Sequence, residues 1–232
     1  KLVTEMQESA TLKMAKMARE LKAQGKDVID LSLGEPDFDT PVHIKEAAKK
    51  ALDNGYTKYT PVNGLLELRQ AIVNKLAREN DLHYTVNQIV VSNGAKQSVY
   101  NLCMALLDPG DEVILPAPYW VSYAEIVKMA GGVPVIANSS IEQDFKSTPE
   151  EIEALITDRT KFILYSSPCN PSGSVFSFEE LQALALMLQA HEHVLVVSDE
   201  IYEHINFTDR HYTIASMEGM KDRTVIINGM SK

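Results

Sequence analysis

Side chains bearing acid, hydroxyl and amine groups follow two apolar segments of the sequence. Residues 194–202 read VLVVSDEIY, so a continuous apolar run ends in Asp199, and Tyr202 follows three residues later. A second apolar run, residues 223–228, leads to Lys232. Such runs are typical of buried parallel strands, which can deliver polar groups at their C-terminal ends. The sequence therefore predicts a carboxylate, a phenol and an amine near one edge of a sheet.

These three groups suit a pyridoxal phosphate site, where each has a separate task. Asp199 would keep the pyridine nitrogen protonated, and Tyr202 would hydrogen-bond the 3-oxygen of the ring. Lys232 would hold the aldehyde as a Schiff base and later move protons. Taken singly, each residue has a simpler interpretation: Asp199 as a turn cap, Tyr202 as half-buried packing, and Lys232 as a solvated amine. Only the combination indicates the cofactor.

Length and composition predict one large domain, or a domain with an appendage. The 232 residues are 45% apolar, which is enough to bury a sizeable core. The formal net charge of −10 argues against nucleic acid or an anionic membrane surface as a partner. No apolar stretch approaches the roughly 20 residues of a membrane span, and the first residues lack a signal-peptide core. We expect a soluble, cytoplasmic protein.

The cysteines and histidines do not form a metal motif. Cys103 and Cys169 are too few for a disulfide framework or a metal quartet, so we expect two reduced thiols. His191 and His193 stand in an HEH sequence, but no partner ligands accompany them. The sequence predicts no bound metal.

Residues 1–40 are expected to form an N-terminal arm and part of a smaller domain, and residues 41–232 the large cofactor-binding domain. Gly25 is placed to end the first predicted helix, and prolines and a glycine make residues 34–41 an irregular loop. The predicted elements before residue 80 are a helix over 5–24, a strand over 28–33, and helices over 43–54 and 64–79.

From residue 88 onward, strands and helices alternate. This repetition predicts an α/β fold with a mostly parallel sheet and helices on both faces, in which ligands bind beyond the C-terminal ends of the strands. The predicted strands cover residues 88–91, 112–115, 133–137, 162–166, 194–199 and 223–228. The predicted helices run to residues 107 and 130, from 149 to 156 and from 178 to 190.

Further polar or aromatic groups fall at those predicted strand ends. Residues 92–96, SNGAK, join a strand to a helix and leave backbone N–H groups exposed, which is an anion site or simply a tight turn. Trp120, the only tryptophan, could lie over a planar cofactor or could be core packing. Asn170 stands between prolines in a stiff loop, where it offers an amide to a ligand or serves the turn itself.

Seven blocks in order resemble the class I and II aminotransferases of the aspartate aminotransferase fold, the type I pyridoxal phosphate enzymes. Within the family, the GEPDFDTP stretch resembles that of the bacterial and archaeal aspartate aminotransferases. The resemblance to the family spans essentially the whole chain. The blocks are SLGEPDFDTP, KYTPVNG, SNGAKQSVYN, DPGDEVILPAPYWVSY, SSPCNPSG, VSDEIYEH and GMSK.

The resemblance implies a role for each block. Lys232 is the Schiff-base lysine and Asp199 the pyridinium partner, while Tyr202 and Asn170 bind the 3-oxygen. The remaining implied contacts are Trp120 and Ile201 on the two ring faces, Gly94, Ala95 and Lys96 on the phosphate, and Gly34 on the substrate side.

The resemblance also implies a homodimer, in which Tyr59 reaches the phosphate of the partner subunit. For a dicarboxylic substrate, Lys96 is the candidate second cation. The segment Ser9-Ala10-Thr11 resembles the one that closes over the distal carboxylate, so Thr11 could add a hydroxyl donor. The implied reaction moves an amino group from an amino acid, first of all aspartate, to 2-oxoglutarate.

The chain departs from the family pattern in two ways. The family places a phosphate-binding arginine and a carboxylate-binding arginine beyond the lysine, so we expect this chain to be the N-terminal part of the protein. Some relatives carry a serine where this chain has Gly229, and whether Ser231 substitutes is open. Alternative functions are an aromatic or broad-specificity aminotransferase, a lyase on the same fold, or a cofactor-binding regulator, for which no DNA-binding module is evident.

Overall fold

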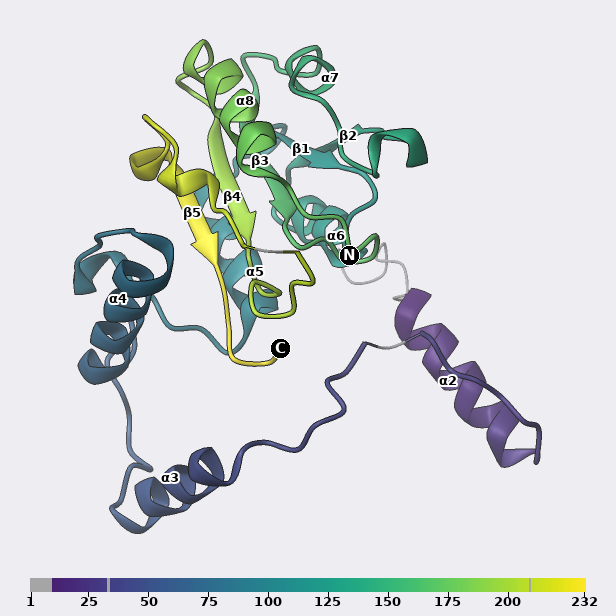
Figure 1. The fold of residues 1–232 in the computed structure, drawn as a ribbon, viewed down its shortest axis with the longest axis vertical. Coiled ribbons are helices and arrows are strands. Elements are labelled where there is room, and N and C mark those ends of the chain that lie inside the picture. The colour runs from purple at the N-terminus through teal and green to yellow at the C-terminus, as the bar shows by residue number, and fades with distance from the viewer. Residues whose placement is uncertain (1–9, 33, 209) are drawn as a thin grey trace.

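A five-stranded sheet, parallel throughout, forms the centre of the chain (Figure 1). The structure is a computed structural model that describes residues 10–32, 34–208 and 210–232, without the side chain of Ala10. The strand order is β2-β1-β3-β4-β5, so the last three strands of the chain lie side by side. The strands are β1 (Glu112–Pro116), β2 (Val133–Ala137), β3 (Thr160–Ser166), β4 (Leu195–Asp199) and β5 (Thr224–Ile227).

Helices cover both faces of this sheet, as the alternating sequence pattern predicts. Side chains of each central strand alternate between two core clusters: Ile163 of β3 packs in one and Leu164 in the other. The first cluster includes α7 (Pro149–Glu153) and α8 (Phe178–Gln189), and the second includes α5 (Ala95–Leu106) and α6 (Ser122–Met129). The continuous apolar runs of β3 and β4 follow from this burial on both sides.

The segments before residue 66 lie outside this core. In Figure 1, α2 (Ala10–Ala23) and α3 (Val42–Asp53) stand apart from the sheet, and α3 has no buried residue. The next helix, α4 (Leu66–Asn80), packs Leu76 into a small cluster with Leu82 and Ala215. The division of the chain near residue 40 stays a prediction.

Two predicted strands are wrong. Residues 28–32 form no strand, because Asp30 accepts hydrogen bonds from Ser32 and the side chains of Ile29 and Leu31 point into solvent; residue 33 lies outside the described residues. In the predicted strand 88–91, the first residue ends a short 3₁₀ helix and the others join no ladder among the described strands. The 3₁₀ helices are η1 (Val86–Gln88), η2 (Ile141–Gln143), η3 (Ile214–Ser216) and η4 (Lys221–Arg223).

The remaining predicted elements are confirmed within a few residues. Capping residues fix two helix starts: the hydroxyls of Thr148 and Ser177 accept from the N–H groups of Glu151 and Glu180, at the first turns of α7 and α8. The first predicted helix is described from residue 10, and Gly25 follows its end with a positive φ of 78°.

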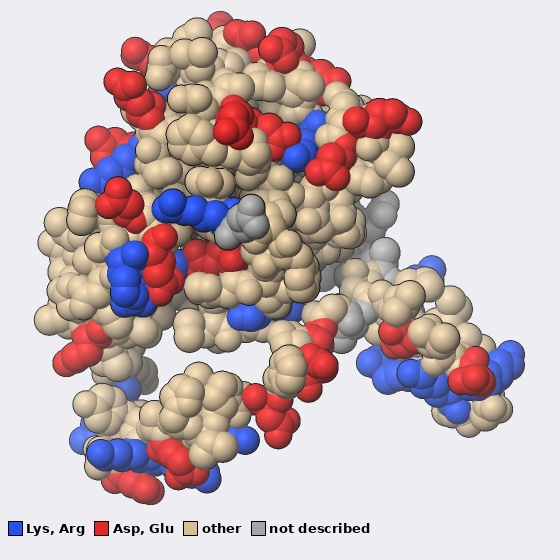
Figure 2. Space-filling model, in the orientation of Figure 1, with Lys and Arg blue, Asp and Glu red and all other residues tan. Residues whose placement is uncertain are grey.

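Charged side chains of both signs are mixed on the face that Figure 2 shows. Acidic side chains predominate around α7 and α8, whereas Lys and Arg are more frequent on α2 and α3. Among the described helices, none combines the length and the apolar character that crossing a membrane requires.

Two leucines of α8 provide a test of this core. Leu184 is 3% exposed and Leu186 is 66% exposed, although both belong to the same helix. Leu184→Ala should lower the free energy of unfolding by about 2–5 kcal/mol, because it leaves a cavity beneath the sheet. Leu186→Ala should change it by less than about 0.5 kcal/mol. Denaturant unfolding of both variants measures the difference, and equal losses would contradict the packing described.

Candidate active site

The parallel register brings the predicted site residues to one edge of the sheet. Ser166 at the end of β3 is paired with Asp199 at the end of β4, and Asp199 with Ile227 at the end of β5. The chain leaves β3 toward Asn170 and leaves β5 toward Lys232. Groups far apart in the sequence therefore start from neighbouring strand ends.

Asp199 is the most buried member of the predicted site, with 3% exposure. Its Oδ2 accepts a hydrogen bond of 2.6 Å from the hydroxyl of Tyr123, and its Oδ1 accepts one of 3.2 Å from the N–H of Ile201. Burial raises the pKa of Asp199, and these two hydrogen bonds oppose the rise. The result is a carboxylate that lacks a full counter-charge among the described residues.

Tyr123 is a site residue that the sequence analysis missed. It lies on α6, is almost fully buried, and packs edge-on against Trp120 with ring centroids 5.5 Å apart. Burial, followed by the nearby charge of Asp199, raises the pKa of the phenol, so its hydroxyl stays protonated and donates. Its position three residues after Trp120 was the available signal, but a tyrosine in an amphipathic helix looks like ordinary core.

Asn170 and Tyr202 lie together, as the predicted roles require. The Asn170 amide nitrogen donates to the Tyr202 hydroxyl at 3.4 Å, and burial raises the pKa of Tyr202. The loop that carries Asn170 is held by Cys169, whose thiol donates to the carbonyl of Pro118 at 3.3 Å, and by Ser166, whose hydroxyl accepts from the Asn170 N–H at 3.4 Å.

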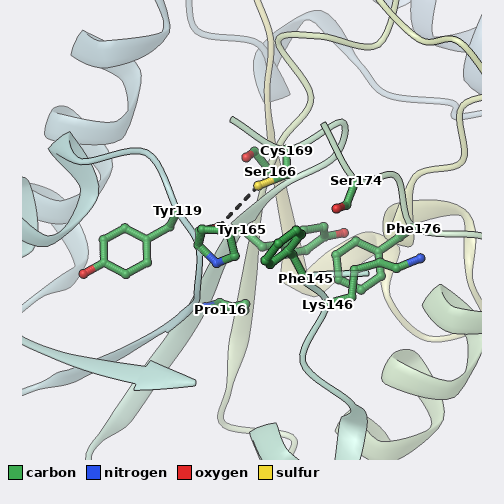
Figure 3. A pocket seen from close by; sticks show the side chains of 10 residues that line it. Pro116, Tyr119, Phe145, Lys146, Tyr165, Ser166, Cys169, Ser174 and Phe176 are labelled. Carbon is green, nitrogen blue, oxygen red and sulfur yellow. Dashed lines mark hydrogen bonds between the residues drawn. The ribbon is translucent and has the colours of Figure 1, made fainter. Parts of the chain in front are cut away.

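A small cavity lies behind this loop (Figure 3). Tyr165, Phe176 and Cys169 are among its lining residues, and its volume of about 10 Å³ is close to that of a single water. It is therefore a packing gap, and it is too small for a cofactor.

Lys232 reaches the same region. Its Nζ donates to the carbonyl of Gly34 at 2.9 Å and lies 5.8 Å from the centroid of the Tyr202 ring. The structure thus brings Gly34, from the irregular loop, next to the predicted reactive amine.

The predicted phosphate site lies at the start of α5. Gly94 precedes the helix with a positive φ of 87°, which favours glycine. Within the described part of the chain, the N–H groups of Ala95 and Lys96 have no acceptor, so they are free to bind an anion at the helix N-terminus. The Nζ of Lys96 lies 4.7 Å from the centroid of the Trp120 ring.

The other predicted residues are not gathered here. Tyr59 is fully exposed at 107%, between α3 and α4, and Ser231 is exposed at the chain end. Thr11 is half-buried in the first turn of α2, while Ser9 lies outside the described residues.

A second carboxylate, which the sequence analysis did not single out, supports the segment after Asp199. Glu200 is 1% exposed, and its Oε1 accepts from the hydroxyls of Ser198 at 2.9 Å and Thr213 at 2.5 Å. Its Oε2 lies 3.0 Å from the Nε2 of His211. These contacts fasten the turn that carries Tyr202 to the rest of the domain.

The donor set fits pyridoxal phosphate. Free N–H groups at a helix N-terminus suit the phosphate, and a buried carboxylate without a cationic partner suits a protonated pyridine nitrogen. A paired phenol and amide suit the 3-oxygen, and a primary amine suits the aldehyde. These groups are Ala95 and Lys96, Asp199, Tyr202 and Asn170, and Lys232.

The raised pKa of Asp199 predicts a pH-dependent stability for the cofactor-free protein. Between the unfolded pKa, about 3.9, and the higher folded pKa, the folded protein retains a proton that the unfolded chain releases, so stability falls as pH rises. Asp199→Asn should therefore raise the free energy of unfolding near pH 7, by about 1.4 kcal/mol for each pKa unit, with no gain near pH 3.

Tyr123→Phe should instead lower the free energy of unfolding near pH 7, because it removes a hydrogen bond that favours the ionised form of Asp199. Its loss of stability should be larger near pH 7 than near pH 3. Denaturant unfolding across this pH range measures both variants, and a pH-independent difference for Asp199→Asn would contradict the desolvated carboxylate.

Comparisons with known proteins identify the family of this chain. The family profile described as "Aminotransferase class I and II" matches residues 26–232. An aspartate/prephenate aminotransferase of Nitrosomonas europaea is 50% identical over 226 residues, which cover 97% of this chain and 57% of that protein. An aspartate aminotransferase of Geobacillus stearothermophilus is 50% identical, over all of this chain and 59% of the relative.

A solved structure is also similar to this chain. The aspartate aminotransferase of Thermus thermophilus with maleate superposes with a TM-score of 0.94 at 45% identity, and the match covers 100% of this chain and 60% of that one. The chain thus spans somewhat less than two thirds of these relatives. The resemblance found in the sequence is confirmed, and the chain belongs to the class I and II aminotransferase family.

Proposed function

We propose that the complete protein is a pyridoxal phosphate-dependent aminotransferase, which moves an amino group from aspartate to 2-oxoglutarate. The observation that carries this proposal is the buried carboxylate of Asp199, which has no cationic partner among the residues that the structure describes and lies at the sheet edge that Lys232 also reaches. The three relatives described above are named as aminotransferases, which supports the reaction type.

The bound cofactor supplies a ring that accepts electrons from the substrate α-carbon. Asp199 holds the proton on the pyridine nitrogen, and Tyr202 with Asn170 binds the 3-oxygen. The N–H groups of Ala95 and Lys96 bind the phosphate, where each charge-assisted hydrogen bond contributes about 1.5–3 kcal/mol. The phosphate is therefore the main anchor, since stacking on Trp120 adds only about 0.5–1.5 kcal/mol. The Lys232 amine takes the proton from the substrate α-carbon.

A substrate with two carboxylates fits the surroundings of Trp120. The Lys96 ammonium lies over this ring and can contact a distal carboxylate. One relative is named for prephenate as well as aspartate, and prephenate also carries two carboxylates, so it is the second candidate substrate. An aromatic or broad-specificity aminotransferase remains the alternative if Lys96 serves only the cofactor.

We also propose that the protein works as a cytoplasmic homodimer. The free thiols Cys103 and Cys169 suit a reducing compartment, and the complete exposure of Tyr59 suits a residue that completes the site of a partner subunit.

The reaction type is tested by the first half-reaction. Aspartate alone, added to the cofactor-loaded full-length protein, should shift the absorbance from the aldehyde form to the amine form. Borohydride reduction followed by peptide mapping should place the pyridoxyl label on Lys232, and Lys232→Ala should abolish both results. Release of ammonia without the amine form would indicate a lyase, and a label on Lys96 would overturn the assignment of the amine.

Lys96→Ala tests the substrate class. The substitution should lower kcat/KM for aspartate and glutamate about ten- to a hundredfold, since it removes a charge-assisted contact, while phenylalanine and alanine are spared. Lys128→Ala, on the surface of α6, is the matched control and should leave kcat/KM unchanged for both kinds of substrate. Equal losses for charged and uncharged substrates would show that Lys96 serves the cofactor.

Subunit mixing tests the role of Tyr59. Lys232→Ala and Tyr59→Phe, each severely impaired alone, should regain part of the activity as heterodimers, because one of the two sites then has both intact residues. Absence of recovery after verified subunit exchange would place Tyr59 outside the partner's site.

A further inference from the structure

One carboxylate joins three parts of the chain beside the candidate site. Glu203 follows Tyr202 directly and is 9% exposed. Its Oε1 accepts from the Asn228 amide at 2.7 Å and pairs with the ammonium of Lys75 on α4. Its Oε2 accepts from the Asn80 amide at 3.4 Å. Helix α4, the turn that carries Tyr202 and the end of β5 therefore meet at Glu203.

The contact continues into residues 228–232, which we name the lysine segment. The Asn228 side chain, held by Glu203 through its nitrogen, accepts a hydrogen bond of 2.7 Å from the N–H of Gly229 through its Oδ1. This bond fixes the first peptide of the segment that ends in Lys232. The orientation of that segment thus depends on a side chain that Glu203 holds.

Close packing adds to the hydrogen bonds. A Cβ built on Gly229 would lie only 2.9 Å from Cδ1 of Ile201, so the backbone of the lysine segment passes close to the turn between Asp199 and Glu203. At this distance a side chain at position 229 would have to shift the terminal methyl of Ile201.

The charge of Glu203 is maintained despite its burial. Burial raises the pKa of this carboxyl, but the hydrogen bond and charge of Lys75, together with the amides of Asn228 and Asn80, lower it overall. An ionised carboxylate accepts only, so it can hold both amides and the ammonium at once.

We propose that Glu203 is a positioning residue for the Lys232 amine and acts through Asn228 and Gly229. The inference rests on the proposed function only in taking Lys232 as the reacting amine. Because a displacement of about 1 Å at a reacting group can cost about a hundredfold in rate, loosening the lysine segment should be costly even though Glu203 touches no reacting atom.

Hydrogen exchange of the full-length protein reports on the lysine segment without any need for catalysis. Glu203→Ala and Asn228→Ala should each speed amide exchange in peptides covering residues 228–232 by about fivefold or more, because each removes one member of the series of hydrogen bonds that ends at Gly229. Glu112→Ala is the matched control. Glu112 is also buried, at 6% exposure, and accepts from Arg159 at 2.5 Å at the start of β1. Its removal should leave exchange in these peptides unchanged.

Kinetics give the second readout. Glu203→Ala should lower kcat by about ten- to a hundredfold and leave KM within about threefold, since the amine is displaced while substrate binding persists. If both residues act through the same series of hydrogen bonds, the double variant Glu203→Ala with Asn228→Ala should be no slower than the worse single variant.

A rescue variant separates positioning from general stability. Glu203→Gln retains an oxygen that can accept from Asn228, and Lys75→Met removes the ammonium that would be left without its carboxylate. The combined variant should keep slow exchange in the lysine segment and most of kcat.

Unchanged exchange in Glu203→Ala, an equal change in Glu112→Ala, or rapid exchange in the rescue variant would each overturn the proposal. If exchange responds as expected in a protein that transfers no amino group, the positioning role stands and the proposed function falls.

Discussion

A carboxylate held out of water at the tip of a parallel strand sets the requirements for the rest of this structure. Asp199 is surrounded by a folded core, and burial of a charge without an opposite charge is costly. The domain reduces this cost with a phenol from α6 and a backbone N–H, which donate to its two oxygens. Neither donor carries a positive charge. A protonated pyridine nitrogen beside Asp199 would therefore supply the positive charge that these donors lack.

The sheet explains how such a group can be held rigidly and still have neighbours of different chemistry. The chain leaves all the parallel strands at the same edge of the sheet. Asn170 follows β3, Asp199 is the last residue of β4, and the segment after β5 leads to Lys232. The crossover from β1 to β2 places α6 on the face that α5 also covers, and there α6 supplies the phenol and α5 supplies free N–H groups. The division of tasks follows from the topology.

Two carboxylates that are not among the proposed reacting groups hold the segments after β4 and β5 in place. Glu200 ties the turn after Asp199 to Thr213 and His211, and Glu203 ties the same turn to α4 and to the end of β5. Glu203 has the Lys75 ammonium as a cationic partner, whereas the donors to Asp199 among the described residues are a neutral phenol and a backbone N–H. This difference in charge balance suits a structural role for Glu203 and a cofactor contact for Asp199.

Much of this arrangement could be predicted from the sequence, because an apolar run followed by polar residues is a local pattern that marks a buried strand and its end. The predicted strands at residues 28–33 and 88–91 failed for a physical reason: short apolar runs favour extended backbone, but only a neighbouring strand makes a ladder. Tyr123 was missed since its apolar neighbours suggest core, and its hydrogen bond spans 76 residues. Glu200 and Glu203 were not singled out, because acids near a strand end are common and their partners come from distant segments. The role proposed for Tyr59 would depend on a second subunit, which one chain cannot supply.

The protonation state of the pyridine nitrogen in the bound cofactor tests the role of Asp199 most directly. It can be measured by NMR from the nitrogen chemical shift of isotope-labelled cofactor, at a pH well above the pKa of the free pyridine nitrogen. The wild-type full-length protein should show a protonated nitrogen, and Asp199→Asn should show an unprotonated one with the cofactor still bound through its phosphate. The same protonated shift in both proteins would contradict the role assigned to Asp199.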